Sequence, residues 1–364
     1  MKRKRKNIIN NILLMLITLV LFFIIVEIIF RMLPVSESSY IQPVNENNPY
    51  MHFEENRDFI FSKGFDFEIV ARKHSNNYGY LDNDDFDKKN EVISVIGDSY
   101  VEAMQVDNSE TFHGLLDRDL YGKDKKLYAI ASSGAPLSQY LAYLKFASNE
   151  FNHKASIINI VSNDFDESLT KYKSTPGHHF FSNVNETCSN IDLIRNDFNG
   201  HSSMVNMARS SAFIRYIVLT AGVRYSSIKR ILNGEKLDPR INQIQNKTIV
   251  SDSQCAVDEF FRNLPKLSNL TPDKLLFILD APRPEIYGTK NNPKLYYNIM
   301  REYFSRKAKN LGYEVLDLKG LFKKDFKDNL KKFEFTIDGH WNEYGHSVVA
   351  KGVRETNFYK NILK

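Results

Sequence analysis

The stretch Glu91–Tyr100, with the sequence EVISVIGDSY, is the part of the chain around which the fold is organised. Its apolar run, Val92–Ile96, ends at Gly97-Asp98-Ser99, and an amphipathic pattern follows. A short continuous apolar run bounded by turn residues is typical of a buried strand. The stretch therefore predicts a strand that ends in a tight turn with a serine hydroxyl at its tip.

Four further apolar runs, separated by amphipathic segments, repeat this pattern along the chain. The five predicted strands are Val92–Ile96, Leu127–Ala131, Ile157–Val161, Leu275–Leu279 and Tyr313–Leu316. Helical spacing of apolar residues predicts a helix capped by Ser109, one that starts near Ser138 and one over residues 293–310. Continuous apolar strands alternating with helices indicate a parallel sheet covered on both faces, which is a three-layer α/β/α domain.

The charge of the chain is concentrated at its beginning. The formal net charge is +5, and the basic run Lys2–Lys6 accounts for all of it. Without that run the chain carries 44 basic and 44 acidic side chains. Because a neutral body gives no support for a nucleic-acid-binding face, we expect no nucleic-acid partner.

The segment after the basic run has the length and composition of a membrane span. Asn7–Val26 contains no charged residue. A helix over residues 8–30 would be about 34 Å long, against a hydrocarbon core of about 30 Å. We interpret it as an uncleaved anchor, with a cleaved signal peptide as the alternative. The positive-inside rule then places Lys2–Lys6 in the cytoplasm and the chain after Pro34 in the periplasm or at the cell surface.

Three segments are predicted from these patterns. Residues 1–34 form a basic cytoplasmic tail and transmembrane anchor, residues 35–90 form a linker or N-terminal arm, and residues 91–364 form the main domain. The arm contains one expected strand, Phe65–Arg72. The main domain is interrupted by residues 165–272. Connections of this length are usually functional or partly disordered, and we interpret this one as an insertion over the edge or top of the sheet.

The insertion contains one helix-like segment, Ala212–Ala221, and both cysteines of the chain, Cys188 and Cys255. An extracytoplasmic location permits a disulfide between them, and two unrelated thiols are the open alternative. The pair His178-His179 is expected in a solvated loop, because no carboxylate or third histidine stands nearby at metal-ligand spacing.

The carboxyl ends of parallel strands meet at one edge of the sheet, where ligands bind. The candidate site residues at or just beyond the predicted strand ends are Ser99, Gly134, Asn163, Asp338 and His340. Ser99 would attack an ester carbonyl, His340 would take its proton, and Asp338 would orient the imidazole. The backbone amides of Ser99 and Gly134 and the side-chain amide of Asn163 would stabilise the oxyanion.

A direct contact between Asp338 and His340 requires a bent loop. Residues two apart diverge around a helix, and on a strand they share a face but stand about 6.6 Å apart. Arg283, just past the fourth predicted strand on the same edge, could bind an anionic glycan or cap its own loop.

This set of residues resembles the SGNH/GDSL hydrolase superfamily, whose sequence blocks centre on a Ser, a Gly, an Asn and a His. Gly97-Asp98-Ser99-Tyr100 is similar to the first block, Gly134 to the second and Ser162-Asn163-Asp164 to the third. Asp338-Gly339-His340-Trp341 has an Asp-x-His-Trp spacing similar to that of membrane-associated members that modify polysaccharides. The resemblance covers roughly residues 91–352 outside the insertion, and it implies a five-stranded parallel sheet of the flavodoxin-like type.

The resemblance also implies a function. We expect a serine esterase or O-acyltransferase that forms an acyl-enzyme and acts on O-acyl groups, chiefly O-acetyl groups, of a cell-surface or extracellular glycan. A lipase or thioesterase of the same fold is one alternative, and a catalytically silent subunit of an envelope polysaccharide assembly is the other. The expected partners are an acylated glycan or other ester substrate, the membrane, and a protein of an envelope polysaccharide-modification system. No cofactor and no metal ion are expected.

Overall fold

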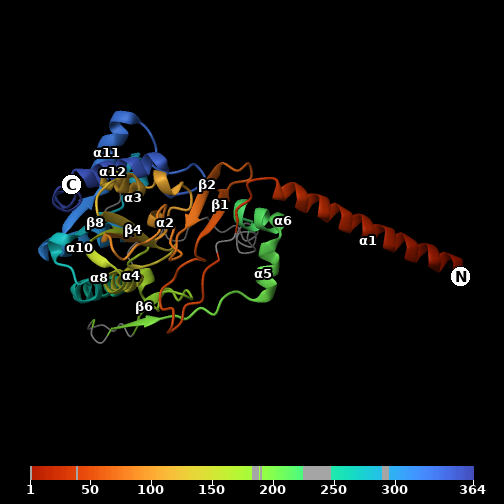
Figure 1. The fold of residues 1–364 in the computed structure, drawn as a ribbon, viewed down its shortest axis with the longest axis horizontal. Coiled ribbons are helices and arrows are strands. Elements are labelled where there is room, and N and C mark those ends of the chain that lie inside the picture. The colour runs from red at the N-terminus through yellow and green to blue at the C-terminus, as the bar shows by residue number, and fades with distance from the viewer. Residues whose placement is uncertain (1, 38–39, 183–187, 189–190, 224–246, 289–294) are drawn as a thin grey trace. The chain divides into compact units, whose positions relative to one another are not determined.

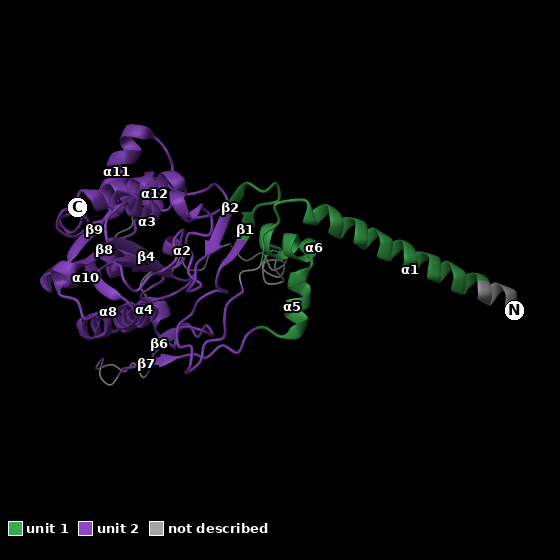
Figure 2. Cartoon of the chain, in the orientation of Figure 1, with its two compact units in different colours: residues 1–38, 59–71, 201–235 green, residues 39–58, 72–200, 236–364 purple. Residues whose placement is uncertain are grey.

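The structure of the chain is a computed structural model that describes residues 2–37, 40–182, 188, 191–223, 247–288 and 295–364, with side chains from residue 7 onward (Figure 1). It divides into two compact units (Figure 2). Unit 1 comprises residues 1–38, 59–71 and 201–235, and unit 2 comprises residues 39–58, 72–200 and 236–364. All the candidate site residues belong to unit 2. The segment boundaries expected from the sequence, at residues 34 and 90, stay a prediction.

The centre of unit 2 is a parallel sheet. Its five strands, in order across the sheet, are β4 (Lys125–Ala131), β3 (Glu91–Gly97), β5 (Asn152–Ile160), β8 (Leu275–Leu279) and β9 (Glu314–Asp317). Every neighbouring pair is parallel. Counted along the chain, the order is 2-1-3-4-5, which is the doubly wound order of flavodoxin-like folds. The fold class predicted from the sequence is therefore confirmed.

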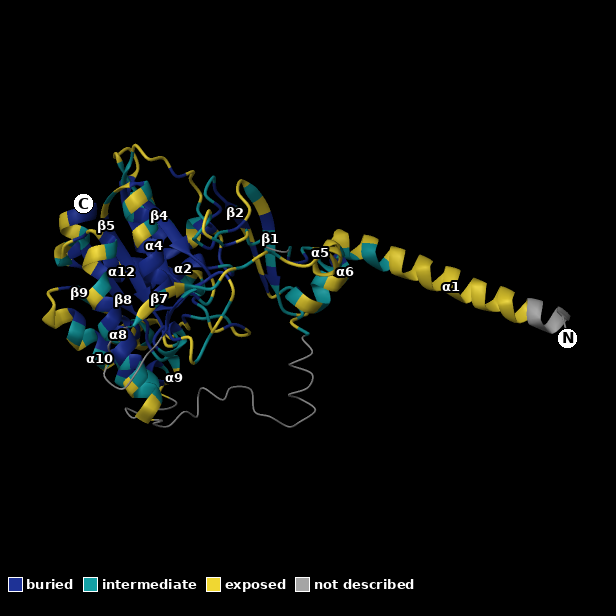
Figure 3. Ribbon diagram, turned by 90° about the horizontal axis from the view of Figure 1, so that it is seen from below, coloured by how far each residue is buried: buried dark blue, intermediate teal, exposed yellow. Residues whose placement is uncertain are grey.

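Helices cover both faces of this sheet and complete the three layers. One face packs against α4 (Leu137–Glu150), α8 (Lys247–Ser268) and α10 (Tyr296–Asn310). The other packs against α3 (Phe112–Asp117), α11 (Leu318–Asn329) and α12 (Glu343–Arg354). In β8 the side chains alternate between the two cores, which is why this strand is apolar at every position. Figure 3 shows β4 and β8 as largely buried, whereas the edge strand β9 has no fully buried residue.

The helix α8 corrects the interpretation of residues 165–272 as an insertion over the edge or top of the sheet. Its side chains Phe260 and Phe261 are buried in the core, where both rings contact Phe277 of β8. This helix is therefore part of the crossover from β5 to β8. The sequence concealed it because residues 165–272 are polar overall, although Val250, Val257 and Leu264 recur at helical spacing within the helix.

The two cysteines form a disulfide. Cys188 is bonded to Cys255 of α8, which decides between the two alternatives left open by the sequence. Cys188 lies between β6 (His179–Ser182) and β7 (Asp192–Arg195), which pair in antiparallel fashion. The disulfide therefore ties Cys188 to a core helix.

The expectation that His178 and His179 lie in a solvated loop is wrong. His178 is only 1% exposed, and its Nε2 lies 3.2 Å from the hydroxyl of Ser132. His179 is the first residue of β6, and its Nδ1 lies 3.0 Å from Oε1 of Gln139. Burial lowers the pKa of His178 to about 3 and that of His179 to about 4, so both rings are neutral at pH 7.

Two smaller expectations also shift. The strand expected at Phe65–Arg72 is β2 (Ile69–Ser75), and it pairs with a strand that the sequence did not predict, β1 (Arg57–Lys63). The cap of α3 is Thr111 rather than Ser109, because the hydroxyl of Thr111 accepts from the amide of the third residue of the helix. The remaining short elements are α2 (Ser99–Glu102), α9 (Arg283–Ile286), 3-10 turns at Asn108–Glu110, Arg118–Leu120, Asp166–Ser168 and Pro272–Lys274, and a π-helical end, Tyr359–Leu363.

Unit 1 is built around the long N-terminal helix α1 (Lys2–Arg31). Its portion Asn7–Arg31 is long and apolar enough to cross a membrane, with a mean hydropathy of 3.2. Residues 7–25 are exposed, and Val26, Glu27 and Phe30 are half-buried. The helix-like segment expected at Ala212–Ala221 is present as α6 (Ala212–Arg215) followed by a π-helical turn, Tyr216–Thr220. It is preceded by a helix that was not expected, α5 (Ser203–Ser210).

Candidate active site

The serine at the end of β3 is held by a short, tightly packed turn. Ser99 is the first residue of α2, and the side chain of Asp98 caps this helix by accepting a hydrogen bond from the amide of Tyr100 at 3.0 Å. The turn lies where β4 and β5 flank β3, which is the switch point in strand order of a doubly wound sheet. Ser99 therefore stands where such folds bind their ligands.

The histidine and aspartate of the last block reach this serine. Nε2 of His340 lies 2.7 Å from Oγ of Ser99, and Nδ1 of His340 lies 2.5 Å from Oδ1 of Asp338. The same carboxylate oxygen accepts the backbone N–H of His340 at 2.9 Å. A β-bridge between Glu334 and Trp341 closes the loop that carries both residues. The bent loop expected from the two-residue spacing is therefore present, and it brings three of the five candidate residues into one chain of hydrogen bonds.

The series of hydrogen bonds through Ser99, His340 and Asp338 is also contacted by a glutamine that the sequence analysis did not single out. The side-chain amide nitrogen of Gln105 lies 3.3 Å from Oδ2 of Asp338, to which it donates, and 3.1 Å from Nδ1 of His340. Asp338 thus receives donors on both of its oxygens, one from His340 and one from Gln105. No sequence signal distinguishes Gln105, because its position depends on the path of the chain after α2.

Trp341 anchors the histidine loop to the neighbouring strand end. Its indole N–H donates to Oδ1 of Asp280 at 3.1 Å, and its ring is only 1% exposed. Asp280 directly follows β8, so this bond joins the fourth strand of the sheet to the residue after His340. The Asp-x-His-Trp spacing noted in the sequence therefore includes a structural anchor as well as the histidine.

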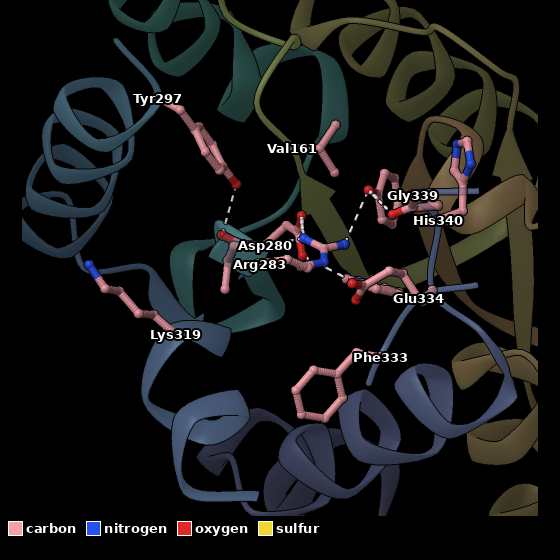
Figure 4. A network of polar contacts seen from close by, with 12 residues as sticks. Val161, Asp280, Arg283, Tyr297, Lys319, Phe333, Glu334, Gly339 and His340 are labelled. Carbon is pink, nitrogen blue, oxygen red and sulfur yellow. Dashed lines mark hydrogen bonds and ion pairs between the residues drawn. The ribbon is translucent and has the colours of Figure 1, made fainter. Parts of the chain in front are cut away.

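Arg283, for which the sequence left two roles open, contacts the same aspartate as Trp341. Arg283 forms an ion pair with Asp280 and donates to the hydroxyl of Tyr100 at 3.1 Å. The Tyr100 hydroxyl in turn donates to the carbonyl oxygen of Gly339 at 2.9 Å, and its ring lies against His340 at a centroid distance of 4.9 Å. Figure 4 shows the Arg283 guanidinium between Asp280 and the loop of Gly339 and His340. The structure thus favours a capping role for Arg283 over binding of an anionic ligand.

The two remaining candidates, Gly134 and Asn163, are connected through an ion pair formed by two other side chains. Glu167 and Lys173 lie 2.5 Å apart. The side-chain amide of Asn163 donates to Oε2 of Glu167 at 2.9 Å, and Lys173 donates to the carbonyl oxygen of Gly134 at 2.8 Å. Gly134 has φ +75°, and an added side chain there would meet Nζ of Lys173 at 3.1 Å. The backbone conformation thus favours a glycine, and a larger residue would also require Lys173 to shift slightly.

Glu167 and Lys173 could not be found from the sequence, since both fall in the stretch interpreted as an insertion. Glu167 follows Asn163 by four residues, a spacing that carries a signal only once the turn is known, and Lys173 lies at no recognisable spacing from Gly134. Their role follows from the turn after β5, which folds back over the loop after β4. One side of the candidate site is therefore polar and charged.

Two buried carboxyl groups flank the serine. Burial raises the pKa of Asp98 to about 6 and that of Glu102, three residues after Ser99, to about 7. Glu102 accepts a hydrogen bond from the hydroxyl of Ser133, the residue before Gly134. The charge close to Ser99 therefore changes between about pH 6 and pH 7.

Within the described part of the chain, no group of three or more His, Cys, Asp or Glu residues is arranged to hold a metal ion. The polar groups around Ser99 are bonded to one another in pairs and chains. The arrangement instead provides a hydroxyl, an imidazole in contact with it and a carboxylate behind the imidazole, which are the parts needed for nucleophilic attack on a carbonyl.

Comparisons with known proteins give only distant likenesses. No protein-family model and no curated protein matches this chain. Among solved structures, LAE5, an alpha/beta hydrolase enzyme from the metagenome of Lake Arreo, is 11% identical over 72% of this chain and 93% of its own, with a TM-score of 0.40. A member of the lipolytic G-D-S-L family from Veillonella parvula is 11% identical over 73% and 98%, with a TM-score of 0.36.

A third structure is a two-domain esterase active on acetylated mannans. It is 9% identical over 76% of this chain and 50% of its own, with a TM-score of 0.38. TM-scores this low are insufficient to support an inference about function. The function of this chain must therefore be inferred from its own residues and their geometry.

Gly97 gives a test of the packing that positions the serine. A side chain at Gly97 would meet Cγ2 of Val101, a residue of α2, at 2.3 Å. We expect Gly97→Ala to lower the free energy of unfolding by about 1–3 kcal/mol, because overpacking forces neighbouring backbone to move. The measurement is urea unfolding of the full chain in mild detergent, followed by the fluorescence of Trp341, the single tryptophan.

The matched control is Gly320→Ala. Gly320 lies in α11 with no atom within 4 Å of an added side chain, so alanine should leave stability unchanged or raise it by up to about 1 kcal/mol. Equal stability of Gly97→Ala and the wild type would show that the turn is not held in this way.

Proposed function

We propose that the protein is a serine esterase or O-acyltransferase with Ser99 as nucleophile, His340 as general base and acid, and Asp338 as the residue that orients the imidazole. The observation that carries this proposal is the continuous hydrogen-bonded chain from Oγ of Ser99 through His340 to Asp338. It stands at the carboxyl edge of a parallel sheet, where the loop of Asp338 and His340 meets a serine more than 200 residues earlier in the sequence.

In the first half of the reaction, Oγ of Ser99 bonds to the acyl carbonyl carbon and its proton passes to Nε2 of His340. Asp338, bonded to Nδ1, stabilises the imidazolium that forms. The tetrahedral intermediate then collapses: the ester bond breaks, and the leaving alkoxide takes the proton from His340. The acyl group remains on Ser99 as an ester.

The second half repeats these steps with a different nucleophile. Water or a sugar hydroxyl gives its proton to His340 and attacks the acyl-serine, and the imidazolium returns the proton to Oγ of Ser99 as the bond to the serine breaks. Hydrolysis and acyl transfer share the same acyl-enzyme. The outcome therefore depends on which acceptor reaches the acyl-serine first.

We assign the oxyanion to the amides of Ser99 and Gly134 and to the side-chain amide of Asn163. A primary amide has two N–H groups, and the bond from Asn163 to Glu167 uses one of them. This bond fixes the plane of the amide and leaves the second N–H for the oxyanion. The ion pair between Glu167 and Lys173 thereby supports both Asn163 and the loop of Gly134.

For the substrate we propose O-acyl groups, chiefly O-acetyl groups, of a cell-surface or extracellular glycan. The polar pair Glu167–Lys173 beside Gly134 favours a polar substrate, since a lipid chain would require apolar surface at this position. A lipase or thioesterase of the same fold is therefore less consistent with this side of the site. A protein of an envelope polysaccharide-modification system remains the proposed partner.

For the location we propose a single-pass anchor, with the basic run before Asn7 in the cytoplasm and unit 2 in the periplasm or at the cell surface. The last turns of α1 support an anchor over a cleaved signal peptide. Phe30 packs against Phe213 and Tyr216 at centroid distances of 5.3 and 4.6 Å, and Glu27 bonds to the chain at Ser211. Removal of α1 would leave these groups without their partners.

Replacing the nucleophile or the base should abolish ester hydrolysis. We expect kcat/KM for p-nitrophenyl acetate to fall by a factor of about 10⁴ or more in Ser99→Ala and in His340→Ala, with little further loss in the double variant, because the two residues act as a unit. Ser347→Ala, an exposed serine of α12, is the matched control and should keep full activity. A wild-type rate no higher than that of Ser99→Ala would exclude an esterase and leave the silent-subunit alternative.

The same assay separates the substrate classes. An esterase of short acyl groups should hydrolyse the acetate faster than p-nitrophenyl laurate, and added acetyl-accepting oligosaccharides should gain acetyl groups if transfer competes with hydrolysis. A preference for laurate would contradict the glycan proposal in favour of a lipase.

Loss of one oxyanion donor should slow the chemical step without weakening substrate binding. We expect Asn163→Ala to lower kcat by a factor of about 10²–10³ with KM nearly unchanged, since the donor acts on charge that develops in the transition state. Asn149→Ala, an exposed asparagine at the end of α4, is the control. An unchanged kcat in Asn163→Ala would remove Asn163 from the site.

The orientation of the anchor can be read from fusions after Lys364. In a Gram-negative host, alkaline phosphatase fused there should be active and green fluorescent protein exported by the same route should be dark, because each reports the compartment in which it folds. A fluorescent fusion together with a stable but inactive phosphatase fusion would reverse the orientation.

A further inference from the structure

The helix α5 in unit 1 has an apolar face that the protein does not cover. Met204, Val205 and Met207 are 75%, 43% and 71% exposed, and together they occupy one side of the helix. Asn206 lies on the opposite side. Isolated apolar residues on a surface need no explanation, but a whole helix face does.

This helix is fixed to the end of the proposed anchor by the carboxylate of Glu27. One of its oxygens accepts from the amide of Ala212 at 2.9 Å, and the other accepts from the hydroxyl of Ser211 at 2.8 Å and the amide of Phe213 at 3.2 Å. The two oxygens of Glu27 thus accept the first two N–H groups of α6, and the carboxylate serves as a cap for that helix. The junction between α5 and α6 is therefore attached to the last turns of α1.

Arg31 completes this junction from the same helix. Its Nε lies 2.8 Å from Glu27, and its Nη2 donates to the carbonyl oxygen of Ser210, the last residue of α5, at 3.1 Å. Arg31 therefore contacts both Glu27 on its own helix and the end of α5. The two charged residues at the end of the apolar span thus hold both ends of the α5–α6 connection.

The orientation of α5 is that of a helix lying in a membrane surface. Figure 2 shows α5 running across the direction of α1 rather than alongside it. Further exposed apolar residues surround the point where α1 ends: Met32 at 82%, Ile214 at 41% and Phe65 at 62%. A spanning helix passes straight through the interface, so a helix attached crosswise at its end lies at the level of the headgroups.

We propose that the apolar face of α5, formed by Met204, Val205 and Met207 and continued by Met32 and Ile214, is inserted into the interfacial region of the bilayer leaflet from which α1 emerges. The occupant of this surface is lipid, because the face lies beside the end of a helix whose residues 7–25 are exposed along their whole length. This inference rests on the proposed anchor and is independent of the chemistry at Ser99. Its consequence is that unit 1 is held to the membrane at two places, which limits the tilt of α1.

The test uses a fluorescent label whose emission reports whether it is surrounded by lipid or by water. Both native cysteines are engaged in the disulfide, so a single introduced cysteine can be labelled with the fluorophore NBD in the full chain without reductant. Labels are placed at Met207→Cys on the apolar face, at Asn206→Cys on the polar face as the matched control, and at Leu19→Cys inside α1. Each protein is reconstituted into vesicles with and without brominated lipids, and aqueous iodide is added in parallel.

We expect the label at Met207 to show blue-shifted emission and a loss of fluorescence in brominated lipid comparable to that at Leu19, while the label at Asn206 is quenched by iodide instead. Iodide quenching at Met207 equal to that at Asn206 would overturn the proposal. So would shielding of Met207 from both quenchers, which would assign the face to a protein partner or a second copy of the chain.

The two underlying proposals fail in distinguishable ways. If the label at Leu19 is not quenched by brominated lipid, the proposal that α1 is a membrane anchor is wrong. The proposal that α5 lies in the membrane interface is then wrong as well, because it rests on that anchor. Ester hydrolysis by the labelled proteins reads the active site separately, because none of the three positions lies in unit 2.

Discussion

The contact between Asp338 and His340 is the constraint on which the candidate site depends. One carboxylate oxygen accepts both the backbone N–H and the ring N–H of the residue two positions later, at 2.9 and 2.5 Å. This double acceptance bends the loop and sets the tautomer of the imidazole, so that Nε2 is free to accept a proton from Ser99. Neither a helix nor a strand could bring residues at this spacing together in this way.

The surrounding framework transfers this loop geometry to the sheet. Trp341 is bonded to Asp280 at the end of β8, and Tyr100, next to the serine at the end of β3, is bonded both to the histidine loop and to Arg283. The serine, the histidine and the arginine come from three separate segments, yet short polar contacts join them along one edge of the sheet. These contacts tie a site built on loops to the ends of β3 and β8.

The strands and the three central site residues could be predicted because the underlying physics is local or topological. Leu275–Leu279 is apolar at every position since both of its faces are buried, and it is found with the predicted bounds. Ser99 and His340 were placed on one edge because parallel strands share their carboxyl edge. The helix α8 is missed because it lies in a long, largely polar stretch interpreted as a single insertion. Gln105 and Lys173 could not be found, since their proximity to the site depends on loop paths that no sequence pattern records.

The identity of the reacting atom tests this account most directly. The full-length protein is treated with a fluorophosphonate, digested, and the modified residue identified by mass spectrometry. The account predicts an adduct on Ser99 that forms in the wild type and is lost or strongly slowed in His340→Ala, because the imidazole removes the serine proton. An adduct on another serine such as Ser133, or labelling of Ser99 at the same rate without His340, would contradict it.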